Sequence, residues 1–353
     1  MRQKSRQKVR QKIRQKIRQK IRIVATAFVM SPVELRLGIQ RLEEAGFQVE
    51  IDSRCLRQAG LFAGNDWERA QALIEAFYDS DCDIVWMARG GYGGARLLPL
   101  LEHAARKRGL PERKKLLVGY SDSTAILGFA REKFGALTLH GPMPGLTGFC
   151  RIPEESFRGL VQAIRGEEET QWVWQKTQLE NWGAKPEGKA IEGQLIGGNL
   201  AVWSSLRGTP AAESVRGKIL FFEEVDEPLY RIDRDFQQVL ASDGLRGVRA
   251  LVLGTFENCR DVVGQGLWRE PETEKELERM VWKPRDSDKK PLRETVPVEE
   301  GLREIFGEVG RRLGIPVWSG LPVGHGAAGQ NPLPLGARYR ITSAGHLELL
   351  RWV

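Results

Sequence analysis

Residues 114–129 read KKLLVGYSDSTAILGF, and this stretch decides the fold. The apolar run 116–118 is followed by a polar turn, and the residues after the turn carry apolar side chains at helical spacing. That order predicts a buried strand, a sharp turn and a helix. Ser121 in such a turn is lifted towards the free N–H groups that begin the helix, where negative charge is favoured. The motif G-Y-S-D-S matches loosely the G-x-S-x-G of a nucleophile elbow, although Ser121 or Asp122 can equally serve as a helix cap.

The same alternation of strand and helix continues on the N-terminal side of this stretch. Strands are predicted at residues 21–25, 47–51, 83–87 and 116–119, and helices at 32–45, 66–78 and 97–108. Strands separated by helices pair in parallel, so the sequence predicts an α/β domain with a doubly wound parallel sheet over residues 21–150. Ligands of such sheets bind beyond the carboxyl ends of the strands.

A glycine-rich loop, residues 88–94, follows one of these strands and therefore lies at the same edge of the sheet as Ser121. Gly90 and Gly91 can bring bare backbone N–H groups close to a ligand, or they can simply form a tight turn. The loop lacks the G-x-G-x-x-G spacing of a dinucleotide fingerprint and does not follow the first strand. No cofactor is therefore predicted.

The second half of the chain predicts a further domain. Residues 151–189 are polar and rich in tryptophan, and we interpret them as a connecting segment. In residues 190–353, strands are predicted at 191–196, 218–223 and 250–255, helices at 200–206, 232–242 and 301–313, and a final hairpin around 343–345. Residues 268–297 are charged and interrupted by prolines, which is typical of an insertion or a flexible loop.

The net charge of +8 comes from the first 22 residues, which hold eleven Lys and Arg and no acid. Residues 2–21 repeat a tetrapeptide, from RQKS and RQKV to three copies of RQKI. Apolar residues that recur every fourth position form a stripe that spirals around a helix, and the like charges between them repel one another. We therefore interpret residues 1–20 as a disordered basic arm. The alternative is an arm that binds nucleic acid or anionic lipid. The remaining chain holds 43 basic and 46 acidic residues, and no nucleic-acid partner is required.

The cysteines and the hydropathy pattern bear on the compartment. Cys55, Cys82, Cys150 and Cys259 are scattered without a C-x-x-C motif, which argues against a metal site and suits a reducing compartment. No apolar run approaches the roughly 20 residues of a membrane span, and no apolar segment follows the charged N-terminus as in a secretory signal. We expect a soluble, cytoplasmic protein.

A serine nucleophile needs a base and, usually, a carboxylate that orients the base. Two of the four histidines are expected at exposed positions. His325 lies between two glycines in a loop after a strand, which favours a reactive ring, and His140 is the alternative base. Glu223 or Glu224, at the end of an apolar strand, can orient the imidazole or can remain solvated.

Six spaced segments resemble those of a known family. They are ARGGYGGARLLP (88–99), VGYSDSTAI (118–126), HGPM (140–143), GGNL (197–200), ILFFEEVDEPLYRIDR (219–234) and GLPVGHG (320–326). In this order they resemble the LD-carboxypeptidase family of serine peptidases, which includes muramoyl-tetrapeptide carboxypeptidases and microcin C immunity peptidases. The resemblance covers residues 21–353 and implies a flavodoxin-like first domain, a smaller β-rich second domain and a homodimer. The RQK arm departs from the family pattern.

The resemblance also implies the catalytic groups. It implies a triad of Ser121 as nucleophile, His325 as base and Glu223 as orienting carboxylate, with an oxyanion hole formed by the backbone N–H groups of Gly91 and Asp122. The acid and the base would come from the second domain, so the site would lie between the domains.

Four further residues are candidates for substrate contacts. Arg89 is a candidate for the terminal carboxylate of a peptide, because a guanidinium binds a carboxylate through two hydrogen bonds. The other three candidates are Gly90, Tyr92 and Asn199.

The expected reaction is hydrolysis of the bond before the C-terminal D-alanine of murein tetrapeptides, as part of peptidoglycan recycling. One alternative is an immunity-type peptidase that cleaves aminoacyl-nucleotide antibiotics, with Trp172, Trp174 or Trp182 stacked on the nucleobase. The other alternative is a non-catalytic α/β binding protein tethered by its basic arm.

Overall fold

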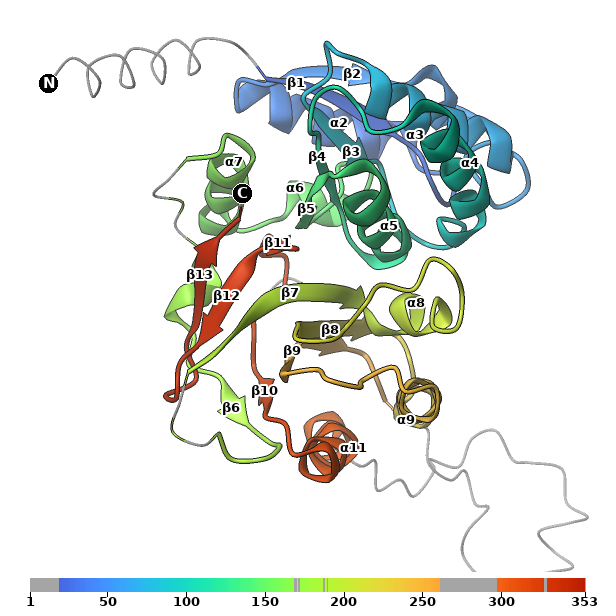
Figure 1. Cartoon of the computed structure of the whole chain (residues 1–353). Helices are drawn as coiled ribbons and strands as arrows, with labels where there is room; N and C mark the ends of the chain where they lie inside the picture. The colour runs from blue at the N-terminus through green and yellow to red at the C-terminus, as the bar shows by residue number, and fades with distance from the viewer. Residues whose placement is uncertain are drawn as a thin grey trace, which may run out of the picture.

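The computed structural model describes residues 19–167, 170, 172–186, 188, 190–260, 297–326 and 329–352. The predicted arm lies outside these residues up to residue 18, and the predicted insertion lies outside them up to residue 296. Figure 1 shows two sheets one above the other, with the N-terminal half of the chain around the upper sheet and most of the C-terminal half around the lower one.

The first sheet has six strands in the order β11-β5-β4-β3-β1-β2. Its parallel strands are β1 (Lys20–Val24), β2 (Gln48–Ile51), β3 (Ile84–Met87), β4 (Leu116–Gly119) and β5 (Leu137–His140). The order 2-1-3-4-5 is that of flavodoxin-like folds, so this prediction is confirmed. β3 and β4 are buried along their whole length, as expected for strands covered on both faces.

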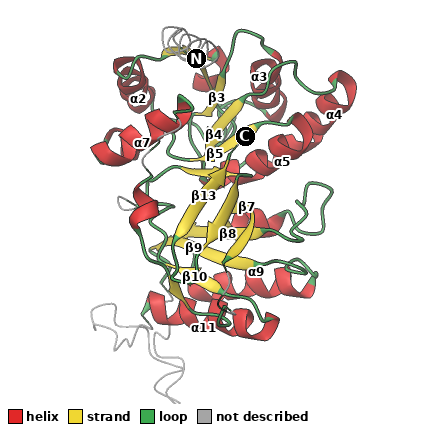
Figure 2. Ribbon diagram, turned by 60° about the vertical axis from the view of Figure 1, so that its left-hand side comes forward, coloured by secondary structure: helices red, strands yellow, loops and turns green. Residues whose placement is uncertain are grey.

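Helices cover both faces of this sheet. They are α2 (Pro32–Glu44), α3 (Asp66–Tyr78), α4 (Leu98–Arg108), α5 (Thr124–Phe134), α6 (Thr147–Cys150) and α7 (Glu154–Ile164). Figure 2 shows α3, α4 and α5 on one side of the strands and α2 and α7 on the other. The segment predicted as a connection, residues 151–189, thus contains α7, which packs beside the first sheet.

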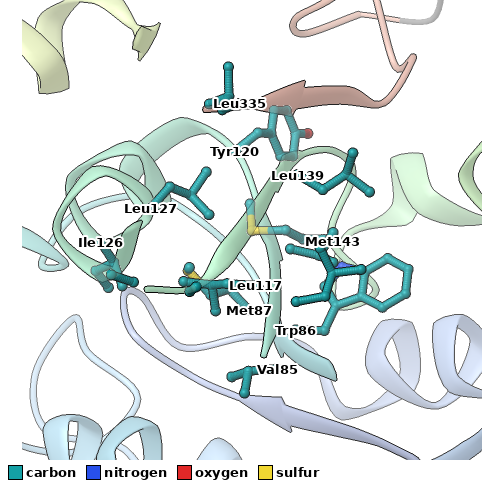
Figure 3. Close-up of a cluster of buried hydrophobic side chains, with 14 of the residues drawn as sticks. Val85, Trp86, Met87, Leu117, Tyr120, Ile126, Leu127, Leu139, Met143 and Leu335 are labelled. Atoms are coloured by element: carbon teal, nitrogen blue, oxygen red, sulfur yellow. The ribbon is translucent and has the colours of Figure 1, made fainter. Parts of the chain in front are cut away.

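The core of the first sheet lies directly beneath the turn that follows β4. Figure 3 shows Met87 of β3, Leu117 of β4 and Leu139 of β5 in one cluster with Tyr120. All four side chains are at most 6% exposed. The strand ends that precede the glycine loop and Ser121 are therefore anchored in close-packed side chains.

The second sheet has seven strands in the order β13-β12-β7-β8-β9-β10-β6. They are β6 (Glu180–Asn181), β7 (Ile191–Asn199), β8 (Ile219–Val225), β9 (Ala250–Glu257), β10 (Val317–Ser319), β12 (Arg338–Ile341) and β13 (Leu347–Arg351). β7 to β10 run parallel, and β12 and β13 form the predicted final hairpin. The helices of this half are α8 (Leu200–Ser205), α9 (Leu229–Ala241) and α11 (Val298–Leu313). Among the helices in the described ranges, none has the length and apolar character needed to cross a bilayer.

One late strand returns to the first sheet. β11 (Leu333–Leu335) pairs antiparallel with β5, and Thr138 Oγ1 donates a hydrogen bond to the carbonyl oxygen of Leu335 at 3.0 Å. The chain therefore passes from the second sheet through the His325 loop and back to the edge of the first sheet.

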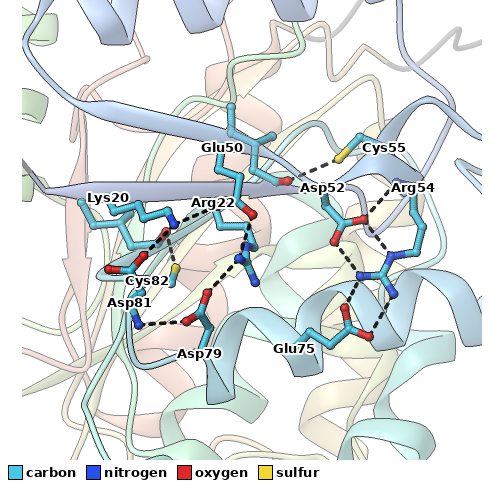
Figure 4. Close-up of polar contacts among 12 residues, drawn as sticks. Lys20, Arg22, Glu50, Asp52, Arg54, Cys55, Glu75, Asp79, Asp81 and Cys82 are labelled. Atoms are coloured by element: carbon cyan, nitrogen blue, oxygen red, sulfur yellow. Dashed lines mark hydrogen bonds and ion pairs between the residues drawn. The ribbon is translucent and has the colours of Figure 1, made fainter.

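The end of the repeat, from residue 19 on, belongs to the folded body. Ile21 and Ile23 of β1 are fully buried, whereas Lys20 Nζ pairs with a carboxylate oxygen of Glu50 at 2.9 Å. Figure 4 shows this network of ion pairs, in which Arg22 also reaches Glu50 at 2.7 Å. The alternation of charged and apolar residues over residues 20–23 thus matches the period of a half-buried strand.

Candidate active site

Ser121 lies in a strained turn between β4 and α5. Its φ is 60°, the left-handed region that non-glycine residues rarely adopt. Such strain costs on the order of 1–3 kcal/mol and persists where the surroundings enforce it. Neither Ser121 nor Asp122 caps the following helix through its side chain, so the capping interpretation is wrong. The turn has the geometry of a nucleophile elbow.

The side chain of Asp122 holds the glycine-rich loop. Its carboxylate oxygens accept hydrogen bonds from the backbone N–H of Gly93 at 3.2 Å and of Gly94 at 2.7 Å. Burial raises the pKa of Asp122 to about 6, although these two N–H groups and the charge of Arg69 favour the ionised form. The fully buried Arg69 donates to the carbonyl oxygen of Gly93 at 3.2 Å. The loop backbone is therefore fixed through both its N–H groups and its carbonyl.

The loop passes over the nucleophile with bare backbone. A Cβ atom on Gly90 would lie 3.0 Å from Ser121 Oγ. Gly91 has a φ of 116°, and a Cβ atom there would lie 2.4 Å from the ring of Phe28. Within the described part of the chain, neither the N–H of Gly91 nor that of Asp122 donates to a backbone carbonyl or a side chain. Both donors of the predicted oxyanion hole are thus free to bind an anion.

Glu223 and His325 form a buried hydrogen-bonded pair. Glu223 of β8 is 0% exposed, and its Oε2 lies 2.6 Å from His325 Nδ1. The β8–β9 pairing shifts register between Phe222 and Glu224, so that Glu223 lies at an irregularity of the ladder. Gly324 leaves room for the contact, because a Cβ atom there would lie 3.0 Å from Glu223 Oε2.

The two partners shift one another's ionisation. Burial opposes a charge on Glu223, but the imidazoles of His325 and His140 outweigh it and hold the pKa of this carboxyl well below its usual range. Burial likewise opposes a charge on His325, but Glu223 outweighs it and raises the pKa of the imidazole above 6.5. With Nδ1–H donating to Glu223, the Nε2 atom of His325 is left to accept a proton.

The two sheets bring these groups to the elbow. The ring of Tyr120, which immediately precedes Ser121, lies against the His325 imidazole with centroids 4.6 Å apart. Thr124, at the start of α5, accepts a hydrogen bond from the backbone N–H of Asn199 at 3.0 Å. No hydrogen bond joins Ser121 to His325 among the described residues. Such contacts are often long in proteins without substrate.

Two models of known domains match the chain. Residues 21–141 match the LD-carboxypeptidase N-terminal domain, and residues 192–298 match the LD-carboxypeptidase C-terminal domain.

The chain belongs to the LD-carboxypeptidase family.

Three relatives illustrate the range of this family. A probable murein peptide carboxypeptidase of Bacillus subtilis is 32% identical over 67% of this chain and 72% of that protein. The crystal structure of a muramoyltetrapeptide carboxypeptidase from Oxalobacter formigenes is 28% identical, covers 94% of this chain and 97% of its own, and has a TM-score of 0.64. The microcin C7 self-immunity protein MccF of Escherichia coli is 25% identical over 62% of this chain and 70% of that protein. The chain is thus a serine-type carboxypeptidase with the two-part fold that its sequence predicted.

The predicted substrate contacts of this LD-carboxypeptidase differ in their surroundings. Arg89 is half-buried, donates to the carbonyl oxygen of Val29 at 2.7 Å and has no carboxylate partner in the described ranges. Tyr92 is 53% exposed beside the glycine loop. Asn199 is buried; its Oδ1 accepts from the N–H of Val202 at 3.1 Å and its Nδ2 donates to Glu224 at 2.6 Å. The geometry therefore gives the Asn199 prediction no support.

Glu223 and Glu224 have different hydrogen-bond partners. Glu224 accepts hydrogen bonds from Asn199 and from the N–H of Ala201, and burial raises its pKa to about 7. His140, the alternative base, is 1% exposed and faces Glu223 rather than an open site. Its burial gives His140 less access to a substrate than His325 has.

The expectation that one of three tryptophans stacks on a nucleobase is wrong. Trp172 and Trp174 are buried and stacked on each other with centroids 5.4 Å apart, and Trp182 is buried beneath Arg303. All three are core residues and none is available to a nucleobase.

Sequence reasoning missed Arg69, because one arginine in a helix gives no signal that its guanidinium is buried under a loop. In the described part of the chain, no group of His, Cys, Asp and Glu side chains could hold a metal ion.

Proposed function

We propose that this LD-carboxypeptidase hydrolyses the peptide bond before the C-terminal D-alanine of murein tetrapeptides through a triad of Ser121, His325 and Glu223. The observation that carries the proposal is the buried 2.6 Å contact between Glu223 and His325, beside a serine held in the left-handed region. The proposed substrate is supported by the names of the B. subtilis and O. formigenes relatives.

The reaction has two steps, each with balanced protons. Ser121 Oγ attacks the carbonyl carbon while His325 Nε2 accepts the hydroxyl proton, and the imidazolium then protonates the leaving D-amino acid. Water, deprotonated by His325, then attacks the resulting ester, and the imidazolium returns the proton to Ser121 Oγ as the peptide product leaves. Glu223 holds the Nδ1–H tautomer and stabilises the imidazolium in both steps.

The N–H groups of Gly91 and Asp122 stabilise the negative oxygen that develops in each step. Two observations support this role. Neither N–H group has an acceptor among the described residues, and the two groups lie on the two segments that meet at Ser121. A single donor of this kind contributes about 3–4 kcal/mol to the transition state in comparable enzymes.

Arg89 binds the terminal carboxylate of the substrate. A carboxypeptidase must distinguish a chain end from an internal residue, and a guanidinium forms two parallel hydrogen bonds with a carboxylate. The support is that Arg89 lies next to the Gly90–Ser121 contact and has no acidic partner among the described residues. Gly90 and Tyr92, in the same loop, are further candidate contacts for the substrate.

A second candidate function is cleavage of an aminoacyl nucleotide, as in immunity-type peptidases. The similarity to MccF favours it, but the buried tryptophans remove the stacking residue on which the sequence argument depended. A homodimer, a cytoplasmic location and a role in peptidoglycan recycling stay predictions.

The decisive experiment incubates the purified protein with a murein tetrapeptide ending in D-alanine, with Ser121→Ala in parallel. We expect only the wild type to release D-alanine and the tripeptide, and mass spectrometry detects both products. Release by both proteins would show that Ser121 is not the nucleophile. Release by neither, together with cleavage of an aminoacyl-nucleotide analogue, would favour the second candidate.

A further inference from the structure

A second imidazole contacts the acid of the proposed triad. His140, the last residue of β5, is 1% exposed, and its Nε2 lies 3.6 Å from Glu223 Oε1. The other carboxylate oxygen, Oε2, lies 2.6 Å from His325 Nδ1. Glu223 therefore lies between two imidazoles, one contributed by the first sheet and one by the loop after the second sheet.

The facing atoms of this contact have no other partner. In the described part of the chain, neither ring nitrogen of His140 nor Oε1 of Glu223 has a hydrogen-bond partner. The His140 ring is enclosed edge-on by Tyr120 and Phe221, with centroids 5.7 Å and 5.3 Å away. Buried polar atoms are rarely left unpaired, and a movement of about half an ångström would bring this pair within hydrogen-bond distance.

The unpaired Oε1 of Glu223 faces the Nε2 atom of His140. An imidazole with its proton on Nε2 can donate that proton to the carboxylate oxygen in a hydrogen bond. The other carboxylate oxygen remains available to His325.

We propose that His140 is a positioning residue that donates from Nε2 to Oε1 of Glu223 and thereby keeps Oε2 directed at His325. His140 is too deeply buried to touch the substrate and acts through the carboxylate alone. The proposal rests on the triad of the proposed function and gives β5 a part in orienting the base.

The proposal predicts how His325 titrates. The titratable groups around this ring are Glu223, Glu224 and Asp226 on and after β8, Tyr120 after β4, and His140 through the carboxylate. Removing the His140 donor destabilises Glu223 more as a lone anion than as the partner of an imidazolium. His325 then holds its proton more tightly, and its pKa rises.

The test is a titration of the full chain by NMR with labelled histidine nitrogens, in the Ser121→Ala background so that turnover plays no part. The chain has four histidines, which single substitutions assign. We expect His140→Leu to raise the pKa of His325 by about half a unit, and His140→Gln, which keeps an N–H donor, to leave it near the parent value. An unchanged or lowered pKa in folded His140→Leu overturns the proposal.

The unsubstituted protein provides a test that does not depend on the folding of a variant. We expect the Nε2 atom of His140 to carry a proton that is shared with Glu223. An Nε2 atom without a proton overturns the proposal.

Kinetics adds an independent readout. We expect His140→Leu to lower kcat on the order of tenfold at unchanged KM and to move the acidic limb of kcat/KM to higher pH. If activity falls but the acidic limb of kcat/KM stays at the same pH, His140 has only a packing role, and the proposal is contradicted. Full activity of Ser121→Ala would overturn the triad itself, while the titration would still decide whether His140 is bonded to Glu223.

Discussion

Two buried carboxylates near the elbow have opposite electrostatics. Glu223 is kept ionised by the imidazoles beside it, whereas Asp122 has only two backbone N–H groups and a guanidinium to offset its burial. The pKa of Glu223 therefore falls and that of Asp122 rises, although both side chains are buried. Their partners, and not their depth, determine the direction.

The first residue-scale prediction concerns the pH dependence of activity. His325 must be neutral to act as a base, and Glu223 raises its pKa, so the wild-type kcat/KM declines as the pH falls through a value above 6.5. In Glu223→Gln the imidazolium loses its counter-charge. The acidic limb should move to lower pH, and the maximal rate should fall about 10⁴-fold, as when the triad carboxylate of a serine protease is neutralised. A pH profile in which the limb stays in place would contradict the assignment of Glu223.

The second prediction concerns Asp122. Because its folded-state pKa of about 6 exceeds the ordinary 3.8, the folded protein binds more protons between these values and loses stability as the pH rises through them, by roughly 3 kcal/mol. Asp122→Asn should abolish this loss, so its Tm relative to wild type should improve between about pH 4 and pH 7. The kcat of Asp122→Asn should fall, because the side-chain amide places an N–H₂ donor against a backbone N–H donor of the glycine loop. If the Tm difference between Asp122→Asn and wild type does not change with pH, Asp122 is not a buried carboxylate with a raised pKa.

Single residues also mark the limits of prediction from sequence. Ser121 and Asp122 belong to one sequence motif and Gly91 to another, and the two motifs lie together in the structure. Glu223 and Glu224 are adjacent and both buried, so the pattern alone left them as alternatives, and only the family motif favoured the first. The side chain of Asn199 hydrogen-bonds to the start of α8 and to Glu224. Glu224 lies 25 residues further along the chain, and composition does not reveal such a pairing.

At the scale of elements, the glycine loop supplies the next prediction. Gly91→Ala combines a left-handed φ with a clash against Phe28, so the loop must move and its N–H must leave the position over Ser121. We expect kcat/KM to fall about 10²–10³-fold, the loss that follows removal of one oxyanion donor. Steady-state kinetics and thermal unfolding measure the effect.

Gly60→Ala is the matched control for this substitution. Gly60 also has a positive φ, of 61°, but nothing lies within 4 Å of its Cβ position. It should cost about 1 kcal/mol of stability through backbone strain and leave activity unchanged. Equal losses of activity in both variants would contradict a specific role for the Gly91 N–H.

The elements that the sequence analysis missed share a physical cause. Strands β1, β3, β4 and β8 are long enough for an apolar pattern to emerge, and they were predicted. β11 has three residues with a proline in the middle, and its partner β5 lies about 190 positions earlier in the chain. Local periodicity contains no information about such a pairing. α7 does have apolar residues at helical spacing, but its setting in a polar, tryptophan-rich segment favoured a linker.

At the scale of the whole molecule, the proposed site lies where the two sheets meet. Its proposed nucleophile and oxyanion donors follow strands of the first sheet, and its proposed acid and base lie on the second sheet and in the loop that leaves it. The Tyr120–His325 and Thr124–Asn199 contacts join the two halves. The proposed triad therefore needs both halves of the chain.

The whole-molecule prediction concerns the repeat. The first described contact of the N-terminal segment is the hydrogen bond from Gln19 to the carbonyl oxygen of Ile164, and β1 follows at Lys20. Deleting residues 2–18 should leave Tm and peptidase activity unchanged. Deleting residues 2–24 removes a central strand and should prevent folding. Loss of activity on the shorter deletion, with Tm preserved, would instead show that the arm takes part in substrate binding.

The return of β11 to the first sheet has a consequence for the order in which the protein matures on the ribosome. Until residues 333–335 emerge, the edge of β5 has no neighbour, and the emerging chain exposes a strand template to other chains. His325 also appears late, only eight residues before β11. A nascent chain therefore carries Ser121 for about two hundred residues of synthesis before its proposed base emerges. The proposed triad is completed, and the sheet edge is covered, in the same final stretch of translation.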